Sequence, residues 1–169
     1  MSENALKAEK SAGVQEEDLL RANLYEFLAT LLRVEPSDEV VLQVTELSGD
    51  DTPIGQASST LAHLAQKMDA TSVRNEYVSL FIGVGRGELL PYCSYYLTGF
   101  LNEKPLAKLR QDMAAIGIAR ADGVKDPEDH IASLCDMMAG LIRGQFNRPF
   151  TLAEQASFFK KHIAPWAGL

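Results

Sequence analysis

Cysteine and histidine are scarce in this chain of 169 residues, which has two cysteines and three histidines. Cys93 and Cys135 lie far apart and form no C-x-x-C pair, so the sequence offers no disulfide framework and a reducing compartment is expected. The histidines, at positions 63, 130 and 162, are scattered, and neither cysteine has a partner at the spacing of a zinc site. We therefore expect no metal site and no cofactor.

The chain also lacks a long apolar run. No segment approaches the ~20 apolar residues needed to cross a membrane. Residues 1–15 are polar and of mixed charge, unlike the apolar core of a signal peptide. We expect residues 1–15 to be a flexible tail and residues 16–169 to form one domain, because this length suits a single domain with a substantial core. A soluble, cytoplasmic protein is expected.

Positive charge is in deficit, since 23 acidic residues outnumber 16 basic ones and the net charge is −7. Nucleic acid is therefore not expected as a partner, because binding to phosphates needs a basic patch. An acidic protein suits a basic partner instead. The apolar share of 46% and the charged share of 23% are ordinary for a globular protein.

Strand patterns are missing as well, because no two segments alternate apolar and polar residues convincingly. Apolar residues recur instead at helical spacing along most of the chain. The clearest stripe consists of Ile131, Leu134, Cys135, Met138, Leu141 and Ile142. It places Cys135 in the core as a structural thiol. The sequence therefore predicts an all-α fold, a single helical-bundle-like domain of about seven or eight helices.

The segment Asp126-Pro127-Glu128-Asp129-His130 precedes that stripe. Asp126 suits the N-cap of a helix, and Pro127 suits the first helical position. Acidic residues in the first turn are favoured by the helix dipole. Helix initiation thus accounts for the segment except for His130, which we expect to be neutral near pH 7 because a cationic imidazole is disfavoured at a helix N-terminus.

Two loops lie upstream of this segment. Gly83-Val84-Gly85-Arg86-Gly87 should end a helix, because its three glycines are poorly suited to a helix interior. It follows a helix and lacks a Lys-Ser/Thr pair, so it is neither a P-loop nor a dinucleotide fingerprint. Pro91-Tyr92-Cys93-Ser94-Tyr95-Tyr96 forms an aromatic loop in which Cys93 is expected to be exposed. Tyrosines in loops commonly serve packing, while their clustering beside Pro91 favours contact with a peptide.

Three classes of function stay open from these residues. Polar groups at a helix start beside an aromatic loop suit a surface that binds a peptide. Peptide binding requires no catalytic residue. An enzyme would hydrolyse a nucleotide at Gly83–Gly87, or use Cys93 as a thiol nucleophile paired with His130. A structural helical scaffold would use the segment at 126–130 only as a helix cap. We identify no catalytic signature and expect a protein that is not an enzyme.

Three motifs, taken in order, resemble those of the TorD/DmsD/NarJ redox-enzyme maturation chaperones: Tyr77-x-x-Leu80-Phe81-x-Gly83, Pro91-Tyr92-x-Ser94-x-Tyr96 and Asp126-Pro127-Glu128-Asp129-His130. The likeness covers most of the chain, from the first helix to His162-x-x-Pro165-Trp166. Two positions depart from the family pattern. Asp126 stands where the family usually has Glu, and Val84 stands where Pro is common.

The resemblance implies an all-helical cytoplasmic chaperone. Such a protein binds the twin-arginine leader and the apo catalytic subunit of a molybdenum oxidoreductase, assists insertion of the molybdopterin cofactor and holds back export. The resemblance also implies domain-swapped homodimers, and a further C-terminal helix after Trp166 that this sequence lacks. The peptide-binding residues that it implies are Tyr92, Ser94, Tyr96, Pro127, Asp129 and His130.

Overall fold

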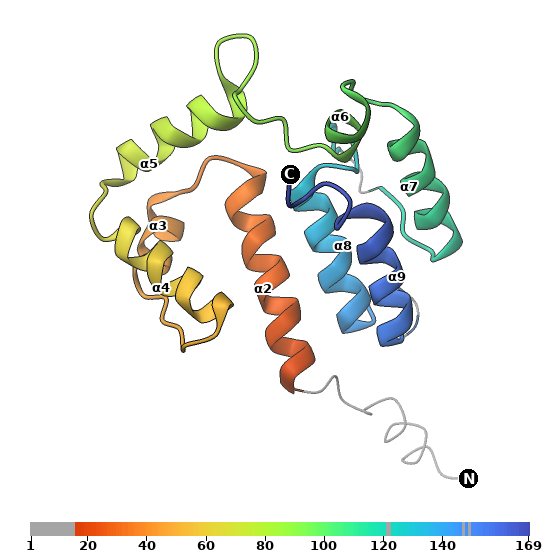
Figure 1. Cartoon of the computed structure of the whole chain (residues 1–169), viewed down its shortest axis with the longest axis horizontal. Coiled ribbons are helices and arrows are strands. Elements are labelled where there is room, and N and C mark those ends of the chain that lie inside the picture. The colour runs from red at the N-terminus through yellow and green to blue at the C-terminus, as the bar shows by residue number, and fades with distance from the viewer. Residues whose placement is uncertain (1–15, 121–122, 147, 149) are drawn as a thin grey trace. The chain divides into compact units, whose positions relative to one another are not determined.

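The computed structural model describes residues 16–120, 123–146, 148 and 150–169, whose regular structure is helical apart from one isolated β-bridge (Figure 1). This part of the chain holds eight α-helices and one π-helical segment, η1. In chain order they are α2 (Glu16–Arg33), α3 (Asp38–Thr45), α4 (Pro53–Ala65), α5 (Ala70–Tyr77), η1 (Val78–Ile82), α6 (Cys93–Thr98), α7 (Lys104–Ala115), α8 (Ile131–Arg143) and α9 (Leu152–His162). The predicted all-α fold of seven or eight helices is confirmed. The predicted tail at residues 1–15 lies outside the described residues, and the domain boundary at residue 16 stays a prediction.

Polar caps fix where several helices begin. Ser37, Thr52 and Asp69 each accept a hydrogen bond from the amide three residues later, at the starts of α3, α4 and α5. Before α9, Thr151 and Glu154 form a reciprocal capping box. These side chains satisfy amides that the first turn of a helix leaves without partners. Each cap joins residues three positions apart, so the local sequence determines where these helices begin.

The contacts between residues group the fold into two compact units. Unit 1 comprises the described residues of Met1–Ala29 and Tyr92–Leu169, and unit 2 is Thr30–Pro91. The division falls within α2. The helices α6 to α9 belong to unit 1, and α3, α4, α5 and η1 belong to unit 2. Among the helices of the described ranges, none is long and apolar enough to span a membrane.

The core of unit 1 is built around α8. Nine of its thirteen residues are buried, Leu134 and Leu141 among the most deeply. The helix is therefore covered around most of its circumference, and not only along the stripe that its sequence predicts. Leu106 and Leu109 of α7 and Phe158 of α9 belong to the same cluster. Complete burial of a side chain of this size contributes about 1.5–3 kcal/mol.

Unit 2 packs α3 against α4, and α5 also contacts α3. Arg74 of α5 pairs with Glu35, at 3.5 Å, and with Asp38. The hydroxyl of Tyr77 donates to the carbonyl oxygen of Leu32 at 3.3 Å. These bonds connect α5 to the start of α3 and to the end of α2.

The glycine loop after η1 is a close backbone turn. Gly83 has a φ of +61°, which L side chains rarely adopt. Its amide donates to the carbonyl of Val78, and the amide of Leu89 donates to the carbonyl of Leu80, both at 2.7 Å. A Cβ at Gly83 or Gly87 would overlap backbone atoms. The loop ends the helix as predicted, and backbone packing accounts for these two glycines without a nucleotide.

Candidate peptide-binding site

The aromatic segment was predicted as a loop, but from residue 93 onward it belongs to α6. It meets the segment at 126–130 in space, although about thirty residues of sequence separate the two. Tyr92 and His130 form an isolated antiparallel bridge. The amide of Cys93 donates to the carbonyl of Asp129 at 3.0 Å. The rings of Tyr92 and His130 contact each other edge to face, with centroids 4.9 Å apart. Backbone pairing therefore fixes the start of α6 beside the start of α8.

Asp129 completes the start of α6 from outside that helix. Its Oδ2 accepts a hydrogen bond of 2.7 Å from the amide of Ser94. Tyr92 occupies the N-cap position of α6 but provides no side-chain cap. Asp129 is 1% exposed and Ser94 is 0% exposed. The carboxylate thus satisfies an amide that would otherwise be buried without a partner, and such a loss costs about 1–3 kcal/mol.

His130 is the N-cap of α8. Its Nδ1 accepts a hydrogen bond of 3.1 Å from the amide of Ala132, and α8 begins at Ile131. Since Nδ1 is an acceptor in this bond, the ring carries its proton on Nε2 and is neutral. The prediction that Asp126 caps this helix is wrong. Residues 127–130 form a turn, closed by a hydrogen bond from the amide of His130 to the carbonyl of Pro127 at 3.2 Å.

Glu128 connects the segment at 126–130 to α7 through hydrogen bonds. Its Oε2 accepts hydrogen bonds from Arg110 Nε at 3.0 Å and Arg110 Nη2 at 2.8 Å. Burial acts to raise the pKa of Glu128, but hydrogen bonds and the charges of Arg110 and Arg120 outweigh it, so the pKa lies below its ordinary value. Arg120 also donates to the carbonyl of Asp126 at 2.8 Å. The pairing of Arg110 with Glu128 cannot be predicted from the sequence, because no local spacing relates the two residues.

We call the contact between residues 92–94 and residues 128–130 the junction. Tyr96 and Pro127 lie next to these residues in sequence, and both are half-buried. The ring of Tyr96 lies 5.3 Å from that of Trp166, whose Nε1 donates to the carbonyl of His162 at 2.7 Å. The structure thus brings Tyr92 together with Ser94, Asp129 and His130, whereas the Tyr96 ring packs on Trp166. Three of the six predicted residues, Ser94, Asp129 and His130, are buried, and the other three are partly accessible.

Both cysteines are buried, so the expectation that Cys93 is exposed is wrong. The amide of Cys93 donates a hydrogen bond to Asp129, and the side chain of Cys93 belongs to the core of unit 1. Burial, together with the charge of Asp129, raises the pKa of Cys93 to about 11. A thiol nucleophile needs a lowered pKa, so these surroundings oppose the thiol-enzyme hypothesis. Among the described residues, no group of three His, Cys, Asp or Glu side chains could hold a metal ion.

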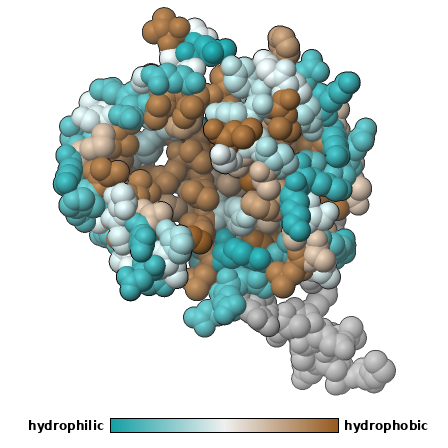
Figure 2. Space-filling view, viewed as in Figure 1, coloured by the Kyte–Doolittle hydropathy of each residue, from teal (hydrophilic) through white to brown (hydrophobic). Residues whose placement is uncertain are grey.

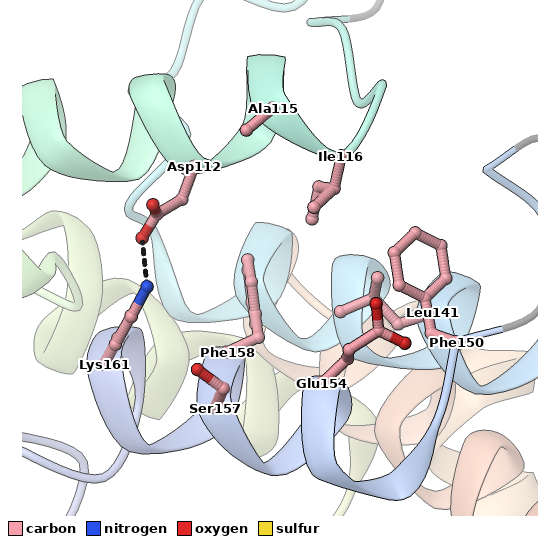
Figure 3. Close-up of a pocket in the computed structure, with 9 residues that line it drawn as sticks. All are labelled: Asp112, Ala115, Ile116, Leu141, Phe150, Glu154, Ser157, Phe158 and Lys161. Atoms are coloured by element: carbon pink, nitrogen blue, oxygen red, sulfur yellow. Dashed lines mark hydrogen bonds and ion pairs between the residues drawn. The ribbon is translucent and has the colours of Figure 1, made fainter.

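A separate pocket of about 270 Å³ opens between α7, α8 and α9 (Figure 3). Its apolar lining includes Ile116, Leu141 and Phe158. Asp112 and Lys161 form an ion pair of 3.3 Å at one side of it. Asp112 also contacts Nε2 of His162 at 2.8 Å. None of the predicted peptide-binding residues lines this pocket.

A family model described as "Nitrate reductase delta subunit" matches residues 48–169, a range that holds all six predicted site residues. This chain belongs to that family. Relatives named "Chaperone protein TorD" include one from Vibrio cholerae, 27% identical over 169 residues, which covers 86% of this chain and 76% of the relative. Another, from Salmonella arizonae, is 26% identical over 133 residues and covers 71% and 61% respectively.

A solved structure has a similar fold. It is described as a putative redox enzyme maturation protein from Archaeoglobus fulgidus, and it aligns with a TM-score of 0.53 and 16% identity over 84% of this chain and 79% of that one. The resemblance to the TorD/DmsD/NarJ family is confirmed by the family model and the curated relatives. Those relatives are named chaperones, in agreement with the prediction of a protein that is not an enzyme.

Proposed function

We propose that this protein is a cytoplasmic chaperone for a molybdenum oxidoreductase. It binds the twin-arginine leader and the apo catalytic subunit, assists cofactor insertion and holds back export until the enzyme is complete. The observation that carries this proposal is the family match across residues 48–169, together with relatives named as TorD chaperones. No residue of the chain has to perform catalysis in this role.

The charge of the chain supports a leader as the ligand. A twin-arginine leader has a basic region followed by a short apolar region. The net charge of −7 attracts the basic region. Grooves between helices bind apolar peptide segments as helices or extended strands. A twin-arginine leader therefore matches the protein in two ways: its basic region complements the negative charge, and its apolar region suits a groove between helices.

We assign two roles to the six predicted peptide-binding residues. Ser94, Asp129 and His130 are buried and hold the two helix starts together. The half-buried side chains of Tyr92, Tyr96 and Pro127 are the ones that can contact a peptide. Aromatic side chains supply large contact areas at small cost in conformational entropy. The buried residues therefore position the surface, and the aromatic rings and the proline form it.

Affinity capture from the cytoplasm of the source organism tests this proposal. A tagged copy of the chain is recovered from growing cells, and its partners are identified by mass spectrometry. The expected partner is the catalytic subunit of a molybdenum oxidoreductase, without its cofactor and with its leader still attached. Capture in which no such subunit is enriched over a tag-only control contradicts the proposal.

A domain-swapped homodimer, implied by the family resemblance, stays a prediction. Light scattering coupled to size-exclusion chromatography measures the mass directly. A dimer whose population depends on refolding conditions is expected for swapping, because exchange of an element requires partial unfolding. A monomer under all refolding conditions contradicts it.

A further inference from the structure

Unit 2 contains an apolar groove distant in sequence from most of the predicted site residues. It has a volume of about 380 Å³, and α3 and α4 supply most of its lining. Among the described residues that line it, Glu76 is the one with a charged side chain. Leu61 and Leu64 of α4 remain 37% and 51% exposed, and Met68 after α4 is 37% exposed. Apolar side chains of this kind, gathered on one surface, mark a binding groove more often than a solvated face.

Apolar side chains also gather visibly over α3 and α4 in the space-filling view, among hydrophilic neighbours (Figure 2). Leu61 and Leu64 are three residues apart on α4, so they lie on the same face of that helix. Val40 and Val44 line the groove from α3 and are four residues apart, so they also share one helix face. The groove is therefore bordered by two helix faces, a form that suits an apolar helix as its occupant.

Negative charge is concentrated in the same unit. Residues 30–91 contain nine acidic and four basic side chains, a net charge of −5 out of −7 for the whole chain. One of the four basic side chains, Arg74, already pairs with Glu35 and Asp38. Glu76 lines the groove and is exposed. An occupant that carries basic residues next to its apolar segment would find complementary charge here.

We propose that this groove binds the apolar segment of the leader as a helix, while the acidic residues of unit 2 attract the basic residues that precede that segment. The proposal rests on the proposed function and adds a binding surface to it. A second copy of the chain is a poorer occupant, because a symmetric contact would place the same acidic surface against itself. The groove volume lies within the range that is typical of ligand sites, about 300–1,000 Å³.

Fluorescence anisotropy with a labelled synthetic peptide tests the groove. The peptide has two adjacent arginines followed by about 12 leucine and alanine residues, the pattern of a leader. The full chain is titrated as wild type and as the double variant Leu61→Gln with Leu64→Gln. Loss of two leucine contacts is expected to raise Kd at least about tenfold. The matched control is Ile54→Gln on the same helix, since Ile54 is 61% exposed and does not line the groove; its Kd should stay within about twofold of wild type.

A charge variant provides an independent measurement. Glu76→Gln should weaken binding of the same peptide at low salt more than Asp51→Asn, which removes an equal charge from unit 2 outside the groove lining. A peptide with both arginines replaced by glutamine should abolish this difference. Equal effects of the two substitutions would mean that only net charge matters, which overturns the assignment to this groove.

The failure of this inference is distinguishable from the failure of the proposed function. If wild type binds the peptide and the Leu61/Leu64 variant binds it as tightly as Ile54→Gln, the groove is not the site, while leader binding stands. If wild type does not bind the peptide at all, both proposals fail. If the double variant leaves Kd unchanged but dissociates a dimer, the occupant is a second copy, and the assignment to a leader is overturned.

Discussion

At the scale of single residues, two acidic side chains of the segment at 126–130 form hydrogen bonds to residues of other helices. Asp129 bonds to Ser94 across 35 positions, and Glu128 bonds to Arg110 across 18. These acidic residues were expected to stabilise the first turn of their own helix. Their carboxylates instead bind other elements, and His130 is left to cap α8. Non-local pairing of this kind cannot be read from the local spacing of capping residues.

Substitution of His130 tests this capping role. His130→Ala removes both the ring and the acceptor, while His130→Asn removes the ring and restores a good N-cap. The alanine variant is expected to be less stable than the asparagine variant by about 1 kcal/mol. Urea denaturation followed by circular dichroism measures the difference in the free energy of unfolding. Equal stability of the two variants would show that Nδ1 contributes nothing as a cap.

His162 makes stability depend on pH. Burial lowers its pKa from 6.5 and outweighs the contact with Asp112, which acts to raise it. The unfolded chain therefore binds a proton more readily than the folded chain, so the stability is complete above pH 6.5 and is lost as the pH falls through the lower, folded pKa. The pKa of Asp112 is also lowered, but from 3.8, so its contribution is lost at more acidic pH.

Denaturation midpoints measured from pH 7.5 down to pH 5 check this expectation. Wild type should lose stability over this interval, and His162→Gln should lose less, because it has no proton to take up at this position. An identical pH dependence in the two proteins would assign the titration to another group. The same variant should leave the start of α8 unchanged, since His130 provides that cap.

At the scale of the helices, apolar periodicity predicted the elements better than it predicted their surroundings. The stripe on α8 was visible, and Leu134, Cys135 and Leu141 are buried as expected. The same helix also buries Ala132 and Met137, which lie outside that stripe. A helix covered on several sides needs neighbours such as α7 and α9, and the positions of these neighbours are set by tertiary packing. Sequence periodicity alone cannot reveal how many sides are covered.

Leu134→Ala tests the core position of α8. Leu134 is 0% exposed, so its truncation should cost about 2–5 kcal/mol of stability through lost burial and a residual cavity. The matched control is Leu152→Ala in α9, where the side chain is 61% exposed and the cost should stay below about 0.5 kcal/mol. Chemical denaturation of both variants measures the two costs. Similar values for the two would contradict the central place of α8 in the core.

At the scale of the whole molecule, helical periodicity predicted the all-α fold class, and the regular elements in the described part of the chain are helices. The surroundings of the predicted site residues were predicted only in part. Tyr92 meets His130, so the aromatic segment lies beside a helix start as expected. The expectation that this segment is a loop is wrong for residues 93–96, which belong to α6. The burial of Ser94, Asp129 and Cys93 was not predicted, because burial depends on which elements cover a loop. The grouping of acidic residues in unit 2 becomes visible only when the chain is divided by contacts.

Calorimetric titration of the purified chain with a synthetic twin-arginine leader measures leader binding itself. We expect saturable binding that weakens several-fold as the ionic strength rises from about 0.01 M to about 0.15 M, because the Debye length falls from about 30 Å to about 8 Å. The driving charge is the net −7 of the chain against the basic region of the leader. If the chain binds the leader of no molybdenum oxidoreductase of the source organism at low ionic strength, the proposed chaperone function is wrong.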